Sequence, residues 1–200
     1  FIFSVSDGEL SATAQVTLSI EAVNDAPVLA SVSDVSFDED GSGSTSLSAN
    51  DVDGDDLTYS ISGGSDITAT LDGSDVSFSA PQDYNGSETF SVSVSDAEYT
   101  DSQSITVTVN AVNDAPIATS GLSGVTNEDQ STVIALSGSD IDGDNLTFSL
   151  DADATNGSVT LDGSLATYTP NEDYNGDDSF SFIVSDGEYT SGADVTVSIA

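Results

Sequence analysis

The stretches "TFSVSVSD" (89–96) and "QSITVTVN" (103–110) alternate apolar residues with serine, threonine or another polar residue. A period of two is typical of half-buried antiparallel strands, because successive side chains of a strand point to opposite faces. The same alternation occurs in "DLTYSIS" (56–62). Working outward from these stretches predicts seven short strands, near 31–37, 44–49, 57–62, 66–71, 75–80, 88–95 and 103–110. Seven short strands separated by turn residues favour a two-sheet Greek-key β-sandwich.

Several motifs recur along the chain with an offset of 89 or 90 residues. "AVNDAP" occurs at 22–27 and 111–116, the pattern DxDGD at 51–55 and 140–144, and "DYNG" at 83–86 and 173–176. A fixed period of this length indicates tandem domains. We therefore expect all-β, seven-stranded Greek-key sandwiches of the immunoglobulin type, joined end to end in an extended array. The predicted boundaries are the last strands of a preceding repeat (1–23), one repeat (24–112) and a second repeat (113–200).

The composition is strongly acidic, with 28 Asp and 8 Glu but no Lys, Arg, His or Cys, and a formal net charge of −36. Nucleic acids are excluded as partners because their recognition depends on cationic side chains. Insertion into a membrane is not expected, since no apolar run approaches the roughly 18 residues that a span needs. Without cysteine there is no disulfide. Repulsion between the uncompensated carboxylates disfavours a compact state. We therefore expect divalent cations from an extracellular medium to neutralise these charges.

The two DxDGD stretches concentrate aspartates at alternate positions, and three interpretations compete. They fit a solvated turn, because Asp and Gly are favourable turn residues. They fit part of a calcium site, because calcium takes six to eight oxygen ligands. They also fit the carboxylate pair of a glycosidase. An EF-hand is excluded, since position twelve is Ser62 in one copy and Asp151 in the other, and no flanking helices are predicted.

The ordered set of motifs resembles the cadherin-like tandem repeats of giant bacterial surface adhesins, which are often exported by type I secretion. The most diagnostic stretch is "NGSVTLDGSLATYTPNEDYNGDDSFSFIVSD" (156–186), followed by "VNDAPV". The resemblance implies calcium at the joint between consecutive domains, with ligands from both domains and the linker. For the joint at 113–116 it implies Glu39, Asp83, Asn85, Asn113, Asp114, Asp140, Asp142 and Asp186. For the joint at 24–27 it implies Asn24, Asp25, Asp51, Asp53 and Asp96.

The resulting hypothesis is a calcium-rigidified spacer of a large extracellular adhesin or filament, mediating adhesion or biofilm attachment. Its partners would be adjacent repeats of the same chain, with sister chains in a filament as a further candidate. The alternative is a calcium-dependent module that binds carbohydrate or protein. An enzyme is not expected, because every acidic pair recurs once per repeat and histidine is absent. Phe78, Phe90, Phe180 and Tyr168 are expected in the core. The aspartates expected in solvent are Asp55, Asp56, Asp144, Asp177 and Asp178.

Overall fold

The computed structural model describes residues 1–200 and contains strands but no helix. The chain divides into two compact units, Phe1–Asn110 and Ala111–Ala200, which are described separately below. No helix is available that is long and apolar enough to cross a membrane.

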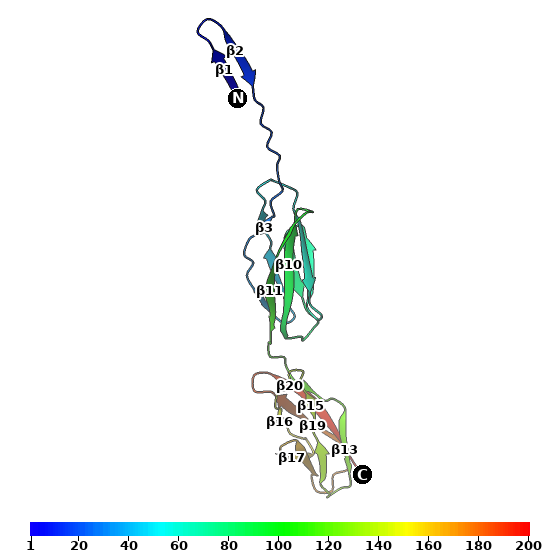
Figure 1. The fold of residues 1–200 in the computed structure, drawn as a ribbon. Helices are drawn as coiled ribbons and strands as arrows, with labels where there is room; N and C mark the ends of the chain where they lie inside the picture. Colours follow the sequence, from blue (N-terminus) through cyan, green and yellow to red (C-terminus); the bar gives the residue numbers. More distant parts are fainter. The chain divides into compact units, whose positions relative to one another are not determined.

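Between β3 and β11 the first unit contains a four-stranded mixed sheet, a three-stranded antiparallel sheet and the short pair β3-β6. The larger sheet has the order β4-β11-β10-β7, with β10 and β11 labelled in Figure 1, and the smaller one has the order β5-β9-β8. Strand β11 pairs with β10 antiparallel and with β4 parallel, so the sheet cannot be a simple meander. The strands are β3 (Val28–Leu29), β4 (Val35–Asp38), β5 (Ser42–Ser46), β6 (Ala49–Asn50), β7 (Thr58–Gly63), β8 (Thr68–Asp72), β9 (Asp75–Ser79), β10 (Gly86–Ser95) and β11 (Thr100–Asn110).

The alternating side chains of these strands form the core of the first unit. In β10 every second residue from Phe90 to Val94 is fully buried, while the serines between them face outward. Phe78 and Phe90 meet edge to face with ring centroids 5.3 Å apart. Burying each such side chain contributes about 1.5–3 kcal/mol. The core residues are Leu29, Phe37, Leu47, Ile67, Val76, Phe78, Phe90, Val92, Val94, Ile105, Val107 and Val109.

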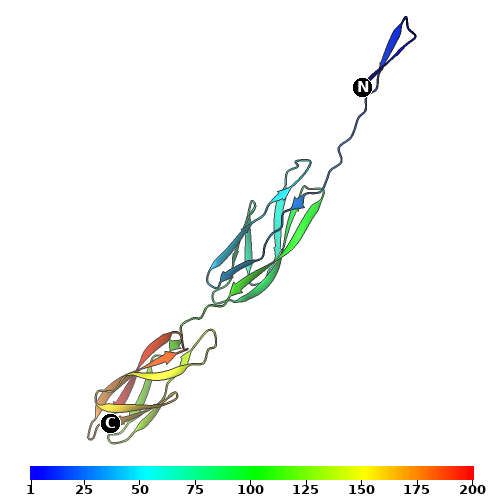
Figure 2. The ribbon, with the colours of Figure 1, turned by 90° about the vertical axis from the view of Figure 1, so that its left-hand side faces the viewer.

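The second unit repeats this arrangement, with the sheets β13-β20-β19-β16 and β14-β18-β17 and the short pair β12-β15. Figure 2 shows β19 and β20, in orange and red, side by side in the larger sheet. Tyr168, Phe182 and Val184 are fully buried in its core. The strands are β12 (Ile117–Ala118), β13 (Leu122–Thr126), β14 (Thr132–Ala135), β15 (Gly138–Ser139), β16 (Thr147–Ala152), β17 (Gly157–Asp162), β18 (Leu165–Pro170), β19 (Gly176–Ser185) and β20 (Thr190–Ile199).

The N-terminal residues form a separate two-stranded hairpin of β1 (Ile2–Ser6) and β2 (Ser11–Gln15). Every side chain of these two strands is exposed. In sequence the hairpin corresponds to β10 and β11, since "SVSDGE" at 4–9 aligns with "SVSDAE" at 93–98.

The predicted fold class of tandem β-sandwiches is confirmed, and the predicted core aromatics Phe78, Phe90, Phe180 and Tyr168 are buried. The first predicted strand, 31–37, is only partly correct. The chain instead forms β3, which pairs with β6, and then crosses to pair β4 with β11. Between these short strands, side chains replace the missing ladder bonds: Asp101 Oδ2 accepts from Leu29 N at 2.9 Å, and Gln103 Oε1 accepts from Val32 N at 3.2 Å.

Candidate calcium-binding loops

The first DxDGD stretch forms a tight loop organised by its own first aspartate. Asp51 Oδ1 accepts hydrogen bonds from the backbone nitrogens of Asp53 (2.9 Å), Gly54 (3.0 Å) and Asp55 (3.4 Å). Gly54 lies in the left-handed region (φ +80°), which glycine enters without steric cost. The loop therefore fixes the backbone through Asp51 Oδ1 alone and leaves Asp51 Oδ2 without a hydrogen-bond partner.

The second DxDGD stretch has the same geometry. Asp140 Oδ1 accepts from the backbone nitrogens of Asp142 (3.0 Å) and Asp144 (3.2 Å). Gly143 has φ +81°. The loop conformation is thus a property of the repeat, reproduced 89 residues apart.

In each loop the three aspartates gather into a triad. One carboxylate oxygen each from Asp51, Asp53 and Asp55 lies within 4.8 Å of the others, and the triad of Asp140, Asp142 and Asp144 meets the same limit. Asp55 and Asp144 are exposed, as expected, and they lie beside the other two aspartates of their triads.

Each triad includes one buried oxygen that lacks a hydrogen-bond partner, Asp51 Oδ2 in the first unit and Asp140 Oδ2 in the second. A buried acceptor without a partner costs about 1–3 kcal/mol, and more when it is charged. Bound calcium would remove this cost, since it is a hard cation that prefers carboxylate oxygen. The donor set and the unpartnered oxygen both fit calcium.

The Asn-Asp dipeptide at the start of each repeat is bonded to the loops of that same unit. In the first unit Asn24 Nδ2 donates to Asp96 Oδ2 (2.9 Å) and Asp25 N donates to Asp53 Oδ2 (2.7 Å). In the second unit Asn113 Nδ2 donates to Asp186 Oδ2 (3.0 Å) and Asp114 N donates to Asp142 Oδ2 (2.8 Å). The structure thus brings together the predicted residues of the following repeat at both linkers.

Asp96 and Asp186 occupy the turns between the last two strands of each unit. Asp96 Oδ1 accepts from Glu98 N (2.8 Å) and Tyr99 N (2.6 Å), and the bond from Tyr99 is the main cause that lowers the pKa of Asp96. For Asp186, desolvation is the largest influence and raises the pKa. The bonds from Glu188 N, Tyr189 N and Asn113 together outweigh it, so that the pKa is lowered.

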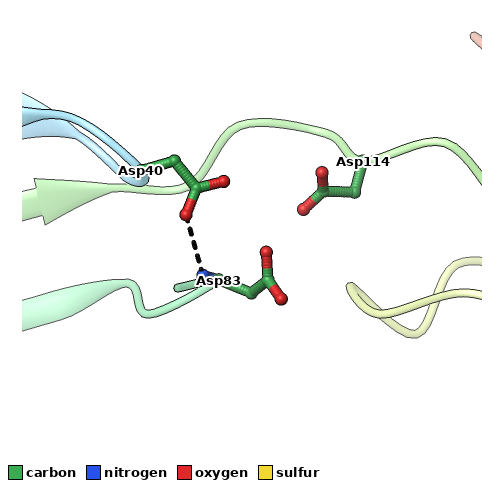
Figure 3. Close-up of side chains that lie close together, drawn as sticks. All are labelled: Asp40, Asp83 and Asp114. Carbon is green, nitrogen blue, oxygen red and sulfur yellow. Dashed lines mark hydrogen bonds between the residues drawn. The ribbon is translucent and has the colours of Figure 1, made fainter. Parts of the chain in front are cut away.

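A second acidic pair lies at the opposite end of each unit. In the first unit Asp83 N donates to Asp40 Oδ1 at 3.2 Å (Figure 3), and in the second unit Asp173 N donates to Asp129 Oδ1 at 3.2 Å. All four residues have φ between +55° and +61°, a conformation that non-glycine residues rarely adopt. Backbone strain that persists at such positions points to a functional hypothesis.

The sequence interpretation named Glu39 and did not name Asp40. Glu39 follows the alternation of β4 inward and is 7% exposed, whereas Asp40 occupies the turn and contacts Asp83. Asn85, also named, is exposed in the loop that follows Asp83. One feature of the sequence could have indicated Asp40 and Asp129 as turn residues, since aspartate tolerates the left-handed region in turns.

One expectation is wrong: Asp178 is not solvated but only 9% exposed. Its carboxylate accepts from Tyr168 Oη (2.9 Å) and from the backbone nitrogens of Asn156 (2.9 Å), Ser179 (2.9 Å) and Thr155 (3.2 Å). A buried carboxylate is tolerated when its oxygens are hydrogen-bonded in this way. Asp178 therefore anchors the loop between β16 and β17.

Glu88, the corresponding residue of the first unit, anchors the equivalent loop through a longer side chain. It accepts bonds from Ser65 Oγ and from the backbone nitrogens of Ser65, Asp66 and Ile67. The Ser65 hydroxyl is the first cause that lowers the pKa of Glu88 to about 2. These two carboxylates stabilise the fold and are not candidates for calcium.

Comparison with known protein families gives two consecutive matches along the chain. The family model described as "Bacterial Ig domain" matches residues 24–108 and 113–199. No curated protein matches the chain in sequence.

Among solved structures, two crystal forms of the EC1-2 fragment of human protocadherin-24 are similar. One has 19% identity and a TM-score of 0.58 over 88% of this chain and 100% of that one. The other has 17% identity and a TM-score of 0.52 over 89% and 99%. The chain also matches the endo-fucoidan hydrolase MfFcnA4 (18% identity, TM-score 0.38), of whose length it covers only 34%. At these identities the likeness concerns the fold alone. Since the family model covers most of the sequence in two consecutive copies, the chain belongs to the bacterial Ig domain family.

Proposed function

We propose that this chain is a calcium-stiffened spacer segment of a large extracellular bacterial adhesin or surface filament. The single observation that supports it best is the aspartate triad with a buried, unpartnered oxygen, present in the DxDGD loop of both units. A turn that only solvates its charges would not bury an acceptor without a partner. The family, whose members are typical of surface and secreted proteins, is consistent with an extracellular location.

In this proposal calcium binds at each joint and draws ligands from both sides of the linker. Asp140 and Asp142 would contribute from the following repeat, Asp40 and Asp83 from the preceding one, and Asp114 from the linker. Without calcium, like charges repel and the joint flexes. With calcium, the charges are neutralised and the neighbouring repeats are crosslinked into an extended array.

Small-angle X-ray scattering of the full chain in calcium and in EDTA tests this directly. We expect calcium to increase the maximum dimension of the chain and to reduce the range of conformations needed to fit the scattering curve. Titration calorimetry is expected to give a dissociation constant on the order of 10⁻⁴–10⁻³ M, as for other extracellular calcium modules. Identical scattering curves in the two buffers would contradict the proposal.

The variant Asp140→Asn removes one charge from the triad but keeps an oxygen that can accept the turn bonds of Asp142 and Asp144. It is expected to weaken calcium binding at the 113–116 joint and to abolish the change in scattering that calcium causes in the wild-type chain. Asp162→Asn, which removes one exposed charge from a hairpin turn of the same unit, is the matched control. Equal behaviour of the two variants would show that overall charge, and not the loop, controls the response.

The proposal assigns no catalytic activity to the chain. Attachment to a cell surface or to sister chains is part of the proposal and is tested separately, by cell-adhesion assays of the parent protein with calcium and with chelator.

A further inference from the structure

We propose that Asp186 is a positioning residue, which holds the linker residue Asn113 by its side-chain amide nitrogen, and that Asp96 holds Asn24 in the same way. This inference rests on the proposed function, because the position of the linker matters most if the linker binds calcium. It differs from the expectation drawn from the resemblance, which made Asp186 and Asp96 calcium ligands.

The hydrogen bonds of Asp186 leave little capacity for a cation. Its Oδ1 accepts from Glu188 N at 2.7 Å and from Tyr189 N at 2.6 Å, and its Oδ2 accepts from Asn113 Nδ2 at 3.0 Å. A carboxylate offers about four lone-pair sites on two oxygens. Oδ1 is therefore fully used, and Oδ2 already has one donor.

The orientation of the Asn113 amide follows from the same contact. An amide oxygen facing a carboxylate would place two acceptors together, so the nitrogen must face Asp186. The amide oxygen is thereby turned away from Asp186, where it can accept or bind a cation. Asp186 thus selects which end of the Asn113 amide is available.

The first unit repeats the arrangement with Asp96 and Asn24, at 2.9 Å. The N-terminal hairpin contains a third copy of this turn. Asp7 makes the same turn bonds, from Glu9 N (3.0 Å) and Leu10 N (2.8 Å). The turn bonds therefore use only Oδ1, and in Asp96 and Asp186 the Oδ2 atom holds the linker asparagine.

The triad aspartates provide the contrast. Asp140 also uses Oδ1 for its turn, but its Oδ2 is buried and has no partner. An oxygen of that kind gains most from a cation. Within one unit the two aspartates with similar turns are thus distinguished: Asp140 presents an unused oxygen, and Asp186 presents one that holds the linker.

The linker dipeptide is attached to the second unit at two points, because Asp114 N also donates to Asp142 Oδ2 at 2.8 Å. Neither bond needs calcium. We therefore expect Asn113 and Asp114 to be ordered as part of the second unit even in EDTA.

The test uses the full ¹⁵N-labelled chain and the variant Asp186→Ser. The serine hydroxyl can still accept the turn bond from Glu188, as serine does in such turns, but it has no second oxygen for Asn113. The matched control is Asp7→Ser, which changes the same kind of turn where no linker asparagine is bonded.

In EDTA, the wild-type Asn113 side-chain amide is expected to have an order parameter near that of rigid backbone, about 0.85, and to fall below about 0.6 in Asp186→Ser. Asp7→Ser should leave it unchanged. A mobile Asn113 amide in the wild type, or an ordered one in Asp186→Ser, would overturn the inference.

A second measurement separates positioning from ligation. Europium luminescence lifetimes in H₂O and D₂O count the water molecules on the bound ion. A positioning role predicts the same count in wild type and Asp186→Ser, together with a weaker affinity, by about 10–100-fold, as is usual when a residue supporting a ligand is lost. A gain of one water would show that Asp186 is a ligand. If the wild type binds neither europium nor calcium, the proposed function fails, and the EDTA experiment still decides whether Asp186 holds the linker.

Discussion

Replacing Tyr168 by phenylalanine should destabilise the second unit far more than the loss of one hydroxyl on a surface would. Tyr168 is fully buried, and its hydroxyl donates to Asp178 Oδ2 at 2.9 Å. A hydrogen bond to a charged group contributes about 1.5–3 kcal/mol. Without it, Asp178 keeps three backbone donors but loses its one side-chain donor. We expect the free energy of unfolding of this unit to fall by about 2 kcal/mol, and its melting temperature by about 8–16 °C, at about 4–8 °C per kcal/mol for a domain of this size.

Native-state hydrogen exchange of the full chain measures this, because it reports the opening free energy of each unit separately. The amides of Phe180 and Phe182 in β19 report on the second unit, and those of Phe90 and Val92 in β10 serve as an internal reference.

The control is Tyr174→Phe, whose hydroxyl donates to the neutral carbonyl of Asp177 at 2.8 Å in an exposed position. That bond should contribute only about 0.5–1.5 kcal/mol. If Tyr168→Phe costs no more than Tyr174→Phe, the buried carboxylate is not held as the structure indicates, and the reasoning fails.

Three further predictions concern the first unit. Ala97 has φ +82° where the equivalent Gly187 has φ +108°, so Ala97→Gly should stabilise the unit by about 0.5 kcal/mol in urea unfolding, since relief of strain exceeds the added chain entropy. The pKa of Glu88 is lowered to about 2, mainly by the Ser65 hydroxyl, so its contribution to stability is complete above the ordinary pKa of about 4.5 and is lost as the pH falls toward 2. Glu88→Gln should flatten the stability profile in that window, as followed by circular dichroism. Gly64→Ala should cost about 2 kcal/mol or more, because its Cβ would clash with the backbone oxygen of Ile67 at φ +76°, and urea unfolding measures the loss.

The repeat period and the alternation within β10 and β11 were enough to predict the sandwich. Both are properties of many residues at once, so a local exception such as the split first strand does not alter the architecture. That split could not be predicted from pattern, because it depends on Asp101 and Gln103, more than 70 residues away, which replace backbone partners with side chains.

The DxDGD loops and the linker dipeptide are local motifs of the sequence, and the structure brings them together within one unit. The predicted ligand set also draws on the preceding repeat and stays a prediction. Asp40 was missed because the sequence "DEDG" does not say which of its acidic residues continues the strand and which makes the turn. The inward alternation of β4 buries Glu39, and the left-handed turn then directs Asp40 to Asp83.

The chain's carboxylates therefore differ in function although the sequence presents them alike. Those of Asp178 and Glu88 are saturated by protein donors, and calcium could gain little from them. Those of Asp96 and Asp186 are nearly saturated and hold the linker. Only Asp51 and Asp140 combine a fixed turn with a buried oxygen that has no partner. With no cationic side chain in the sequence, backbone, hydroxyl and asparagine amide donors satisfy the first two groups, and the proposed calcium would satisfy the third.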